Sequence, residues 1–477
     1  MLNKINNTVN FTSKRDFALE IAKKYLARQE NVADNRFIQD TATNWLPKAV
    51  FTRSLADFSE MSFLEFVESG IFYFLPTGIG NFFKNAYSKF HPEKLRREIS
   101  SNIGKSAKEI LSDKTLKENG TNKRVLSTKA AIILACTIIP AAEYALSFVK
   151  NLFTLGLFKK SDFNNIANLN KEQNEDKKQQ EKVKINAIKN LTGASIVSLA
   201  GFVGSIIFAK YGHKSEILQK ASSLILQPGV HLANGFKKIG LKQTGLEHFL
   251  KRYITPDFAG INEKTGKFRL SEGQLLVTTV SGLFGYSEAA GDRGKLDQYE
   301  VWTRVPIVVL YTVFGSALFD HFFNKYLIKK NIFPEIIKRD ANGVTTITET
   351  KALDNLAEKA AKVKNTAKEV ELNRLIKEKA IVKGTPYLFG IVFMGFLLSG
   401  ITRFWTQYRY NHLKKNEKQE TSPFKALLWT GNKHNVIKKE IFSQKSMRKK
   451  SNFDKSGLRA EAEGQNHAFA RSPFNGE

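Results

Sequence analysis

Two long runs without a charged residue constrain this chain more than any other feature of its sequence. Residues 191–209 and 384–402 contain no Asp, Glu, Lys or Arg, and Leu, Ile, Val, Phe and Gly dominate both. A helix needs about 20 apolar residues to cross a bilayer, which matches these lengths. Because charged residues make up 25% of the chain, two such runs are not expected by chance. They predict transmembrane helices, and buried core helices of a soluble protein are the alternative.

Two further apolar segments have a similar length but carry ionisable residues. Residues 130–149 contain Glu143, and residues 305–324 contain Asp320 and His321 near their end. An aromatic and basic cluster also follows the run at 384–402, as is typical of an anchor at the membrane interface. Together the four segments predict an all-α, polytopic membrane protein with about four transmembrane helices.

Small residues recur on one stripe of the run at 191–209. Their spacings are four, three and four, and they are Ala194, Ser198, Gly201 and Ser205. Small side chains on one helix face let neighbouring backbones approach closely, so this stripe predicts a packed helical bundle.

Two other apolar stretches are less suited to crossing a bilayer. Residues 63–83 are rich in Phe and carry two glutamates, and residues 275–287 are too short to span comfortably. We expect one or two of these stretches to be interfacial, re-entrant or buried helices.

The connections between these segments differ in composition. Residues 161–190 contain the polar run KEQNEDKKQQEK, which is typical of a flexible linker. Apolar residues recur at alternating spacings of three and four in residues 350–380, which predicts a heptad-like helix that packs on its own protein or on a coiled-coil partner. The expected regions are a basic N-terminal region (1–129), a first transmembrane pair (130–209), a polar region (210–304), a second transmembrane pair (305–402) and a basic, disordered tail (403–477).

The net charge of +29, from 74 Lys and Arg against 45 Asp and Glu, favours an anionic partner. The basic tail lacks the interleaved aromatic residues that stack on bases, so nucleic acid is not expected and anionic phospholipids are. An AT-rich genome, which enriches Lys and Asn, is the alternative source of the charge. The distribution of Lys and Arg favours four spans with both termini cytoplasmic, in a bacterial cell membrane.

No sequence motif for catalysis or for a cofactor is present. The chain has one cysteine, Cys136, and lacks a P-loop, a nucleophile elbow and an HExxH pair. We therefore expect no cofactor and no metal, and a non-enzymatic protein is favoured over an enzyme.

Ionisable residues inside apolar segments are the first candidates for function, because each costs a few kcal/mol at a helix centre. Glu143 lies near the middle of its segment and would serve an ion or proton route. The alternative is that Glu143 shifts toward the head groups. Asp320 and His321 lie near a segment end, where an interfacial position explains them.

The densest polar stretch beside the apolar segments is residues 285–300, which include Glu288, Asp292 and Asp297 between glycines. Such carboxylates would hold Mg²⁺ and a phosphate. The stretch resembles in outline the acidic motif of the CDP-alcohol phosphatidyltransferases. The paired aspartates that open that motif and its following Asp-Gly are missing, so no residue role is carried over. A charged loop that joins two helices is the alternative.

These observations lead to three functional hypotheses. The first is a non-enzymatic membrane scaffold that binds anionic phospholipids and contacts a protein partner through residues 350–380. The second is a transporter or channel that uses Glu143. The third is a Mg²⁺-dependent lipid-modifying enzyme centred on Glu288, Asp292 and Asp297. The sequence leaves the substrate and the oligomeric state open.

Overall fold

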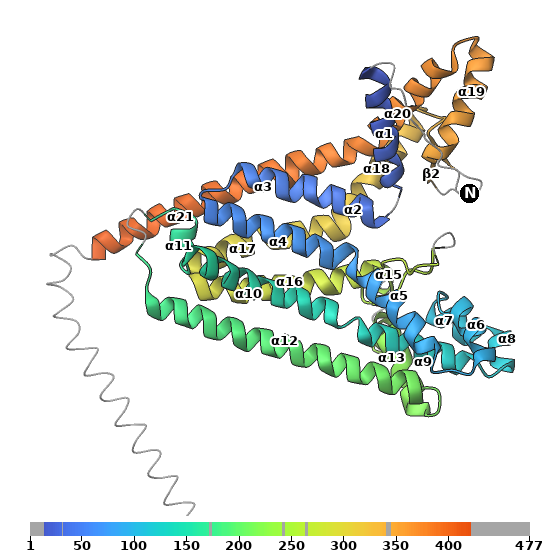
Figure 1. Ribbon diagram of the computed structural model, residues 1–477, viewed down its shortest axis with the longest axis horizontal. Helices are drawn as coiled ribbons and strands as arrows, with labels where there is room; N and C mark the ends of the chain where they lie inside the picture. Colours follow the sequence, from blue (N-terminus) through green and yellow to red (C-terminus); the bar gives the residue numbers. More distant parts are fainter. Residues whose placement is uncertain are drawn as a thin grey trace, which may run out of the picture. The chain divides into compact units, whose positions relative to one another are not determined.

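A computed structural model describes residues 14–30, 32–170, 174–240, 244–262, 266–339 and 345–420 (Figure 1). The chain divides into two compact units, Met1–Gln407 and Tyr408–Glu477. The described part of the second unit is the end of one helix, up to Glu420. All other described elements belong to the first unit.

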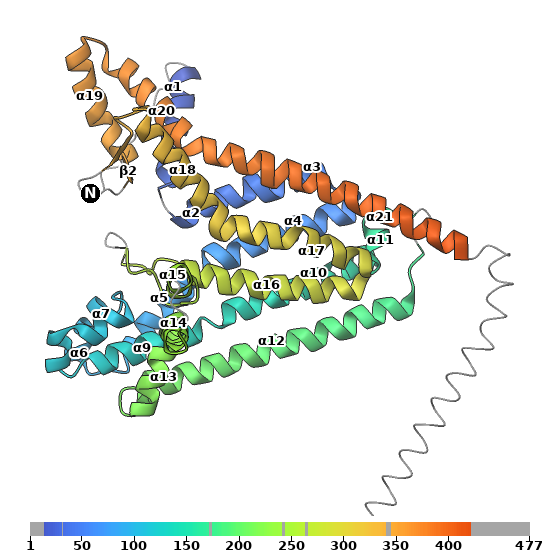
Figure 2. The same cartoon turned by 180° about the vertical axis from the view of Figure 1, so that it is seen from behind.

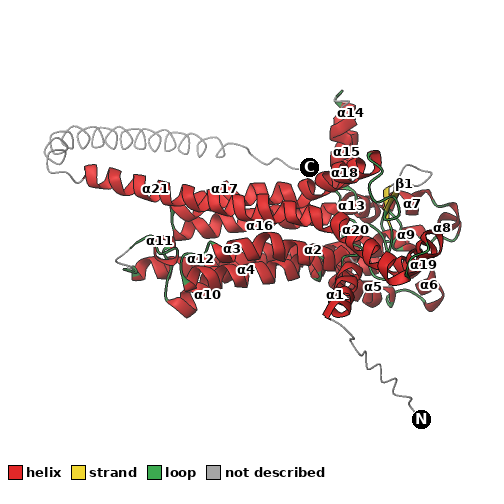
Figure 3. Ribbon diagram, turned by 90° about the horizontal axis from the view of Figure 1, so that it is seen from above, coloured by secondary structure: helices red, strands yellow, loops and turns green. Residues whose placement is uncertain are grey.

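The described chain is almost entirely helical, which confirms the predicted all-α fold (Figure 3). The β-structure among the described residues is a short antiparallel pair, β1 (Ile337–Arg339) with β2 (Thr345–Ile347), and an isolated bridge between Ile261 and Phe268. The N-terminal helices are α1 (Lys14–Arg28), α2 (Val32–Asp40), η1 (Thr41–Trp45), α3 (Leu46–Val50), α4 (Leu55–Tyr73), α5 (Leu75–Ser88), α6 (Glu93–Asn102), α7 (Ala107–Ser112) and α8 (Lys114–Glu118). The middle of the chain forms α9 (Asn122–Ala135), α10 (Ile138–Phe158), α11 (Phe163–Ile166), α12 (Lys177–Tyr211), α13 (Glu216–Leu226), α14 (Pro228–Lys238), α15 (Thr244–Tyr253) and α16 (Glu272–Arg293). The C-terminal elements are α17 (Lys295–Leu310), η2 (Tyr311–Gly315), α18 (Ser316–Lys329), η3 (Thr350–Ala352), α19 (Leu353–Lys364), α20 (Lys368–Phe389), η4 (Gly390–Leu397) and α21 (Leu398–Glu420).

Within the described ranges, three helical stretches are long and apolar enough to cross a membrane. They are Asn122–Phe158, Lys177–Tyr211 and Lys368–Lys414, and they contain three of the four predicted segments. The fourth predicted segment falls in a helix pair, Lys295–Gly315 with Leu318–Lys329, which is bent by 42°. Helical stretches of suitable length and composition therefore stand where the sequence predicts spans.

The first of these stretches is not one straight helix. Residues 130–149 cross the boundary between α9 and α10, which turns at Cys136 and Thr137. Lys129, just before this segment, is fully buried and forms an ion pair with Asp257 at 2.9 Å. A buried lysine requires such a partner, because an unpaired charge is costly away from water. Lys129 therefore does not anchor the segment at a water-exposed boundary.

The prediction of a flexible linker at 161–190 is wrong for its second half. The first polar turns of α12 begin at Lys177, with the side chain of Asp176 accepting a hydrogen bond from the Lys178 backbone at 2.9 Å. This N-cap satisfies an amide that the helix leaves free. Val183 and Ala187 are then buried against the bundle, so tertiary packing overrides the polar composition.

The alternative interpretation of residues 285–300, a charged loop that joins two helices, is also wrong. Residues 275–287 lie inside α16, which begins with a capping box at Ser271 and continues to Arg293. Gly294, with a φ of 128°, separates α16 from α17, whose first residue is Lys295. Residues with a side chain rarely adopt such a φ, so the one break in this stretch falls at a glycine.

Two other predicted helices are each divided. Residues 63–83 belong to α4 and α5, which meet at Phe74. Residues 350–380 do not form one heptad-like helix, because Asn365 adopts a left-handed conformation that ends α19. The stripe is split accordingly: Leu353 is buried, whereas Val363 is 87% exposed.

The tail expected at 403–477 begins as a helix. Residues 403–420 continue α21, and residues 421–477 lie outside the described residues. Within α21, Thr402 and Thr406 are buried, and Thr406 donates a hydrogen bond to Glu300 at 2.8 Å. The expectation of disorder is therefore wrong for residues 403–420. For residues 421–477, which lie outside the described residues, it stays a prediction.

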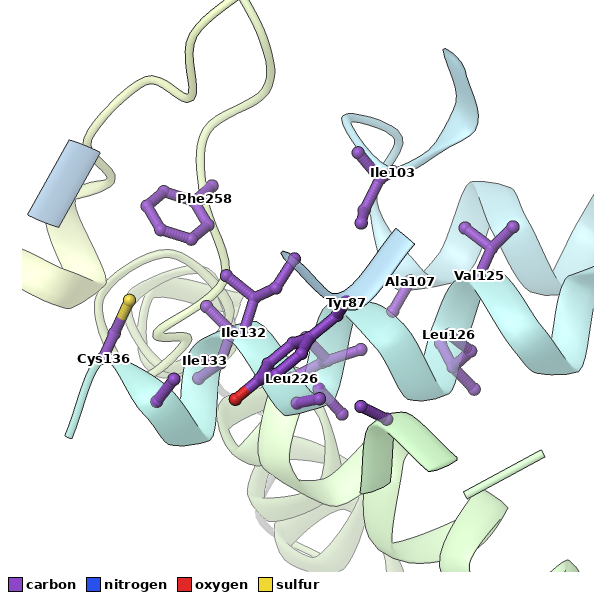
Figure 4. Close-up of a cluster of buried hydrophobic side chains, with 14 of the residues drawn as sticks. Tyr87, Ile103, Ala107, Val125, Leu126, Ile132, Ile133, Cys136, Leu226 and Phe258 are labelled. Carbon is purple, nitrogen blue, oxygen red and sulfur yellow. The ribbon is translucent and has the colours of Figure 1, made fainter. Parts of the chain in front are cut away.

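One hydrophobic core lies where α5, α9 and α13 meet. Buried side chains from these helices and from the loop before α16 fill it, including Tyr87, Ile132, Leu226 and Phe258 (Figure 4). Cys136, the one cysteine of the chain, belongs to this core as a buried free thiol. With one cysteine no disulfide can form within the chain, so burial of apolar surface stabilises this core.

A second hydrophobic core joins α1 to elements between α18 and α20. Leu26 of α1 packs with residues of α18, β1, α19 and α20. Glu30 accepts hydrogen bonds from the backbone and the side chain of Thr350, at 2.6 and 2.7 Å, and pairs with the buried Lys379 at 2.5 Å. Lys23 pairs with Asp354 at 3.0 Å. The N-terminal helix is thus held by residues more than 300 positions away.

The remaining helices form a bundle in which α10 packs along α16, α12 and α4. Two opposite views show α12 at the edge of this bundle (Figures 1 and 2). The predicted stripe of small residues on α12 faces its neighbours: Ala194 and Ser205 are buried, and a Cβ at Gly201 would clash with Thr137. Small residues at this contact let the helix backbones approach closely, as predicted.

Candidate functional site

Two clusters of ionisable side chains lie inside the bundle on the same three helices. Glu60 of α4, Lys150 of α10, and Arg293 of α16 form the first cluster, together with Asp297 of α17, and we call it the ion-pair layer. All four residues are buried. Glu60 contacts Lys150 at 3.1 Å and Arg293 at 2.6 Å, and Arg293 contacts Asp297 at 2.7 Å. Two acids and two bases therefore neutralise one another, as buried charges require.

The second cluster contains Glu68 of α4, Glu143 of α10 and Tyr286 of α16, and we call it the carboxyl layer. The Tyr286 hydroxyl lies 3.0 Å from Glu68 Oε2 and 3.1 Å from Glu143 Oε1. Glu143 is fully buried, and its Oε2 has no hydrogen-bond partner among the described residues. One hydroxyl thus stands between two acids.

Helical periodicity explains why the same helices supply both layers. Seven residues separate Glu143 from Lys150 and also Tyr286 from Arg293, and eight separate Glu60 from Glu68. These spacings are about two helical turns, or roughly 10–12 Å along the axis. Side chains two turns apart share a helix face. The order of the two layers is reversed along α4, which is therefore antiparallel to α10 and α16.

Additional charged residues surround the carboxyl layer on its α4 side. Asp40 of α2 accepts a hydrogen bond from Ser69 at 3.0 Å and another from Asn44. Lys48 of α3 pairs with Glu65 of α4. The lysine of this region is therefore already engaged by a glutamate other than Glu68 or Glu143.

Close helix packing confines Glu143. A Cβ at Gly282 of α16 would lie 2.8 Å from Glu143 Oε1, and one at Gly285 would clash with the carbonyl oxygen of Tyr144. Only glycine fits at such close approach. The short apolar segment of α16 thus supplies the close contact against which the carboxyl group of Glu143 is held.

The structure separates Asp297 from Glu288 and Asp292, the other two acids that the sequence grouped as a magnesium site. Glu288 accepts hydrogen bonds from Tyr144 at 2.6 Å and Asn190 at 3.1 Å. Asp292 accepts one from Asn186 at 2.6 Å, whereas Asp297 belongs to the ion-pair layer. Among the described residues, no three His, Cys, Asp or Glu side chains converge in a way that would hold a metal ion. Glu288 and Asp292 instead attach α16 to α12.

Asp320 and His321 lie on α18, apart from both layers. His321 is exposed and its ring contacts that of Phe322, whereas Asp320 is half-buried. The helix continues from these residues to Lys329, beyond the end of the predicted segment. Their position at a membrane interface stays a prediction.

Several site residues were not predicted from the sequence. Glu68, Tyr286, Glu60 and Arg293 were missed, because each lies outside the four predicted spans. The signal was available in the seven- and eight-residue spacings of ionisable residues on neighbouring apolar helices. The partner helix of each residue is not visible in the sequence, since it depends on tertiary packing.

A buried base that contacts a hydroxyl group lies outside the apolar stretches. His91 precedes α6, and its Nε2 is 2.8 Å from Thr128 Oγ1. Its Nδ1 has no hydrogen-bond partner in the part of the chain described. Burial, and then the charges of Arg124 and His213, lower the pKa of His91 to about 4. The imidazole is therefore neutral in the folded protein at pH 7.

Comparison of the chain with protein-family models, with curated proteins and with solved structures finds no match. Function is therefore inferred from the sequence and the geometry of the chain.

Proposed function

We propose that this chain is a multi-pass membrane protein that acts as a non-enzymatic, lipid-associated scaffold. The observation that carries the proposal is the outward face of α12. Of the most apolar stretch of this helix, only 6% is buried, against 50% for the stretch in Asn122–Phe158. The outward side chains are large and aliphatic or aromatic, with exposures of 42–62%: Ile196, Val197, Leu199, Phe202, Val203 and Ile207.

Water is a poor solvent for such a surface. Each buried CH₂ contributes about 0.8 kcal/mol, so a continuous apolar stripe favours an apolar environment by many kcal/mol. The uncharged run ends at Lys210 and is preceded by Lys189. A run of this length would extend about 28 Å as a helix, close to the thickness of a bilayer core. A lipid environment therefore accounts for both the length and the outward face.

The test places one charge at the centre of this face. Leu199→Arg would put a guanidinium in the bilayer core, at a cost of about 2.5–3.5 kcal/mol on insertion scales. We expect the unmodified protein to stay in the pellet after alkaline carbonate extraction, and Leu199→Arg to move in part to the supernatant or to be degraded. The matched control is Ile217→Arg on α13, which is 79% exposed but outside the spans and should stay in the pellet. Release of the unmodified protein into the supernatant would overturn the proposal.

The net charge of +29 supports association with anionic phospholipids. We expect phosphatidylglycerol nanodiscs to raise the melting temperature of the protein above its value in phosphatidylcholine nanodiscs. The difference should shrink as salt is added, because screening weakens attraction between exposed charges. Equal melting temperatures in both lipids would argue against anionic lipid as a partner.

The scaffold role also needs a contact surface for a partner. Two valines on either side of the turn between α19 and α20 are exposed, Val363 of α19 at 87% and Val370 of α20 at 56%. Both lie on the stripe for which the sequence predicted a partner. We assign the protein contact to this turn, and Val363→Asp is the variant that would weaken it without disturbing the buried Leu353.

The carboxyl layer favours a second candidate function, proton or cation translocation through the bundle. A fully buried glutamate inside an apolar stretch, with one oxygen unpaired among the described residues, is energetically costly, and such a residue is a candidate for function by default. Reconstituted vesicles would show a proton flux that Glu143→Gln abolishes. An equal flux in both proteins would exclude this function for Glu143.

A further inference from the structure

The number of hydrogen-bond donors and acceptors in the carboxyl layer indicates that one of its two acids is protonated. The Tyr286 hydroxyl contacts two acids, Glu68 Oε2 at 3.0 Å and Glu143 Oε1 at 3.1 Å. A phenol carries one hydrogen and donates one hydrogen bond, whereas an ionised carboxylate only accepts. If both acids were ionised, one of the two contacts would set two acceptors against each other. Both contacts are hydrogen bonds only when one acid is itself protonated and donates to the hydroxyl oxygen.

The burial of Glu143 identifies the acid that holds this proton in the structure. The side chain is fully buried, and its Oε2 has no hydrogen-bond partner among the described residues. An unpaired oxygen costs far more on a charged group than on a neutral one, since charge must be solvated or paired when buried. Glu143 in its neutral form, donating from Oε1 to Tyr286, satisfies the geometry at the lower cost.

The groups around the layer do not supply the missing positive charge. Glu68 from α4, Tyr286 from α16 and Asp40 from α2 are the titratable groups that act on Glu143. Lys48 from α3 acts on Glu68 from a distance but is paired with Glu65. Among the described residues of this region, acids therefore outnumber bases, in contrast to the ion-pair layer. A proton is the smallest cation that restores the balance.

We infer that Glu143, Tyr286 and Glu68 form a binding site for one proton, which passes between the two acids through the hydroxyl. In the transfer, Glu143 gives its proton to the Tyr286 oxygen as Tyr286 gives its own proton to Glu68. Two O–H bonds break and two form, so tyrosine is unchanged and the net result is movement of one proton from Glu143 to Glu68. The negative charge moves in the opposite direction, and no other reactant takes part.

The biological purpose of this site rests on the second candidate function, translocation. The test of the site is independent of that function. The bound proton is measured directly in the protein at rest, whereas translocation is measured as a flux. A proton in the site without a flux would leave the site standing and exclude translocation. A flux without a bound proton would exclude the site.

The experiment is infrared spectroscopy of the full chain in detergent or nanodiscs, which detects the C=O stretch of a protonated carboxyl group. We expect the unmodified protein to show this band at pH 7, and Glu143→Gln to lose it. The matched control is Glu288→Gln, two residues from Tyr286, where an exposed acid accepts hydrogen bonds from Tyr144 and Asn190. This control should keep the band. Absence of the band from the unmodified protein at pH 7, or its persistence in Glu143→Gln, would overturn the inference.

Two further measurements, the melting temperature of Glu143→Gln and the infrared band of Tyr286→Phe, distinguish loss of the proton site from misfolding. Glu143→Gln should keep the melting temperature of the unmodified protein at pH 7, because the amide matches the neutral acid in size and also donates to Tyr286. Tyr286→Phe should keep the band but shift its frequency, since the acid loses its hydrogen-bond acceptor. An unshifted band in a folded Tyr286→Phe protein would show that the hydroxyl does not bridge the acids.

Discussion

The ion-pair layer and the carboxyl layer are two ways of accommodating buried ionisable side chains on the same three helices. In the first, Glu60 meets Lys150 and Arg293, and charge is cancelled by opposite charge. In the second, Glu68 and Glu143 face one hydroxyl. Oppositely charged partners fix a structure, whereas a shortage of them leaves a group free to exchange its proton. The contrast separates a part of the bundle that holds the helices together from a part that is able to change state.

The largest effect should come from breaking the balance of the ion-pair layer. Arg293→Met removes the base that contacts both Glu60 and Asp297, and it leaves a buried acid uncompensated. Losing one partner of a buried pair typically costs about 3–5 kcal/mol. Chemical unfolding should show a loss of this size. The control Lys362→Met removes a lysine whose side chain is 76% exposed and should change stability by less than about 1 kcal/mol. Equal effects of both substitutions would mean that burial of the layer has no energetic consequence.

His91 adds a third kind of buried ionisable group to the comparison, because it is a base that contacts a hydroxyl group rather than an acid. Its folded pKa of about 4 lies below the ordinary value of 6.5, so the folded state binds a proton less readily than the unfolded state. Stability is therefore full above pH 6.5 and falls as the pH drops toward 4, by on the order of 2–3 kcal/mol. Unfolding measured at several pH values should show this decline, and His91→Gln should flatten its slope. The same slope in both proteins would assign the decline to other groups.

The smallest of these effects tests how tightly the carboxyl layer is held. Gly282→Ala places a methyl group 2.8 Å from Glu143 Oε1, so the acid must shift away from Tyr286. Overpacking of this kind costs about 1–3 kcal/mol. Gly291→Ala is the control on the same helix, because its nearest neighbour is Gln298 Nε2 at 3.4 Å. The melting temperature should fall more for Gly282→Ala than for Gly291→Ala. An equal change in the two variants would show that Glu143 is not confined at Gly282.

Local composition was enough to predict some parts of the fold. The uncharged runs at 191–209 and 384–402 lie in long helices, and the small residues of α12 pack against their neighbours as expected. The predictions failed where tertiary contacts override composition. The polar residues 177–190 are helical because Val183 and Ala187 are buried, and residues 350–380 divide at Asn365.

The candidate site was only partly predictable for the same reason. Glu143 stood out because it interrupts an apolar segment, which is a one-dimensional signal. Its partners Glu68 and Tyr286 are brought to it by helices far away in sequence. Asp297 was named for a magnesium site, but it pairs with Arg293, which also contacts Glu60 of α4. Spacing along one helix is visible in a sequence, and the choice of neighbouring helix is not.

The core that joins α1 to α20 has a consequence for how the protein is made. Leu26 and Glu30 leave the ribosome well before Lys379 and the residues that cover Leu26. Until those residues are made, α1 has no packing partner, and its apolar face is open to chaperones and proteases. A product truncated before α18 would therefore leave the apolar face of α1 uncovered and recognisable to the cell's quality-control machinery.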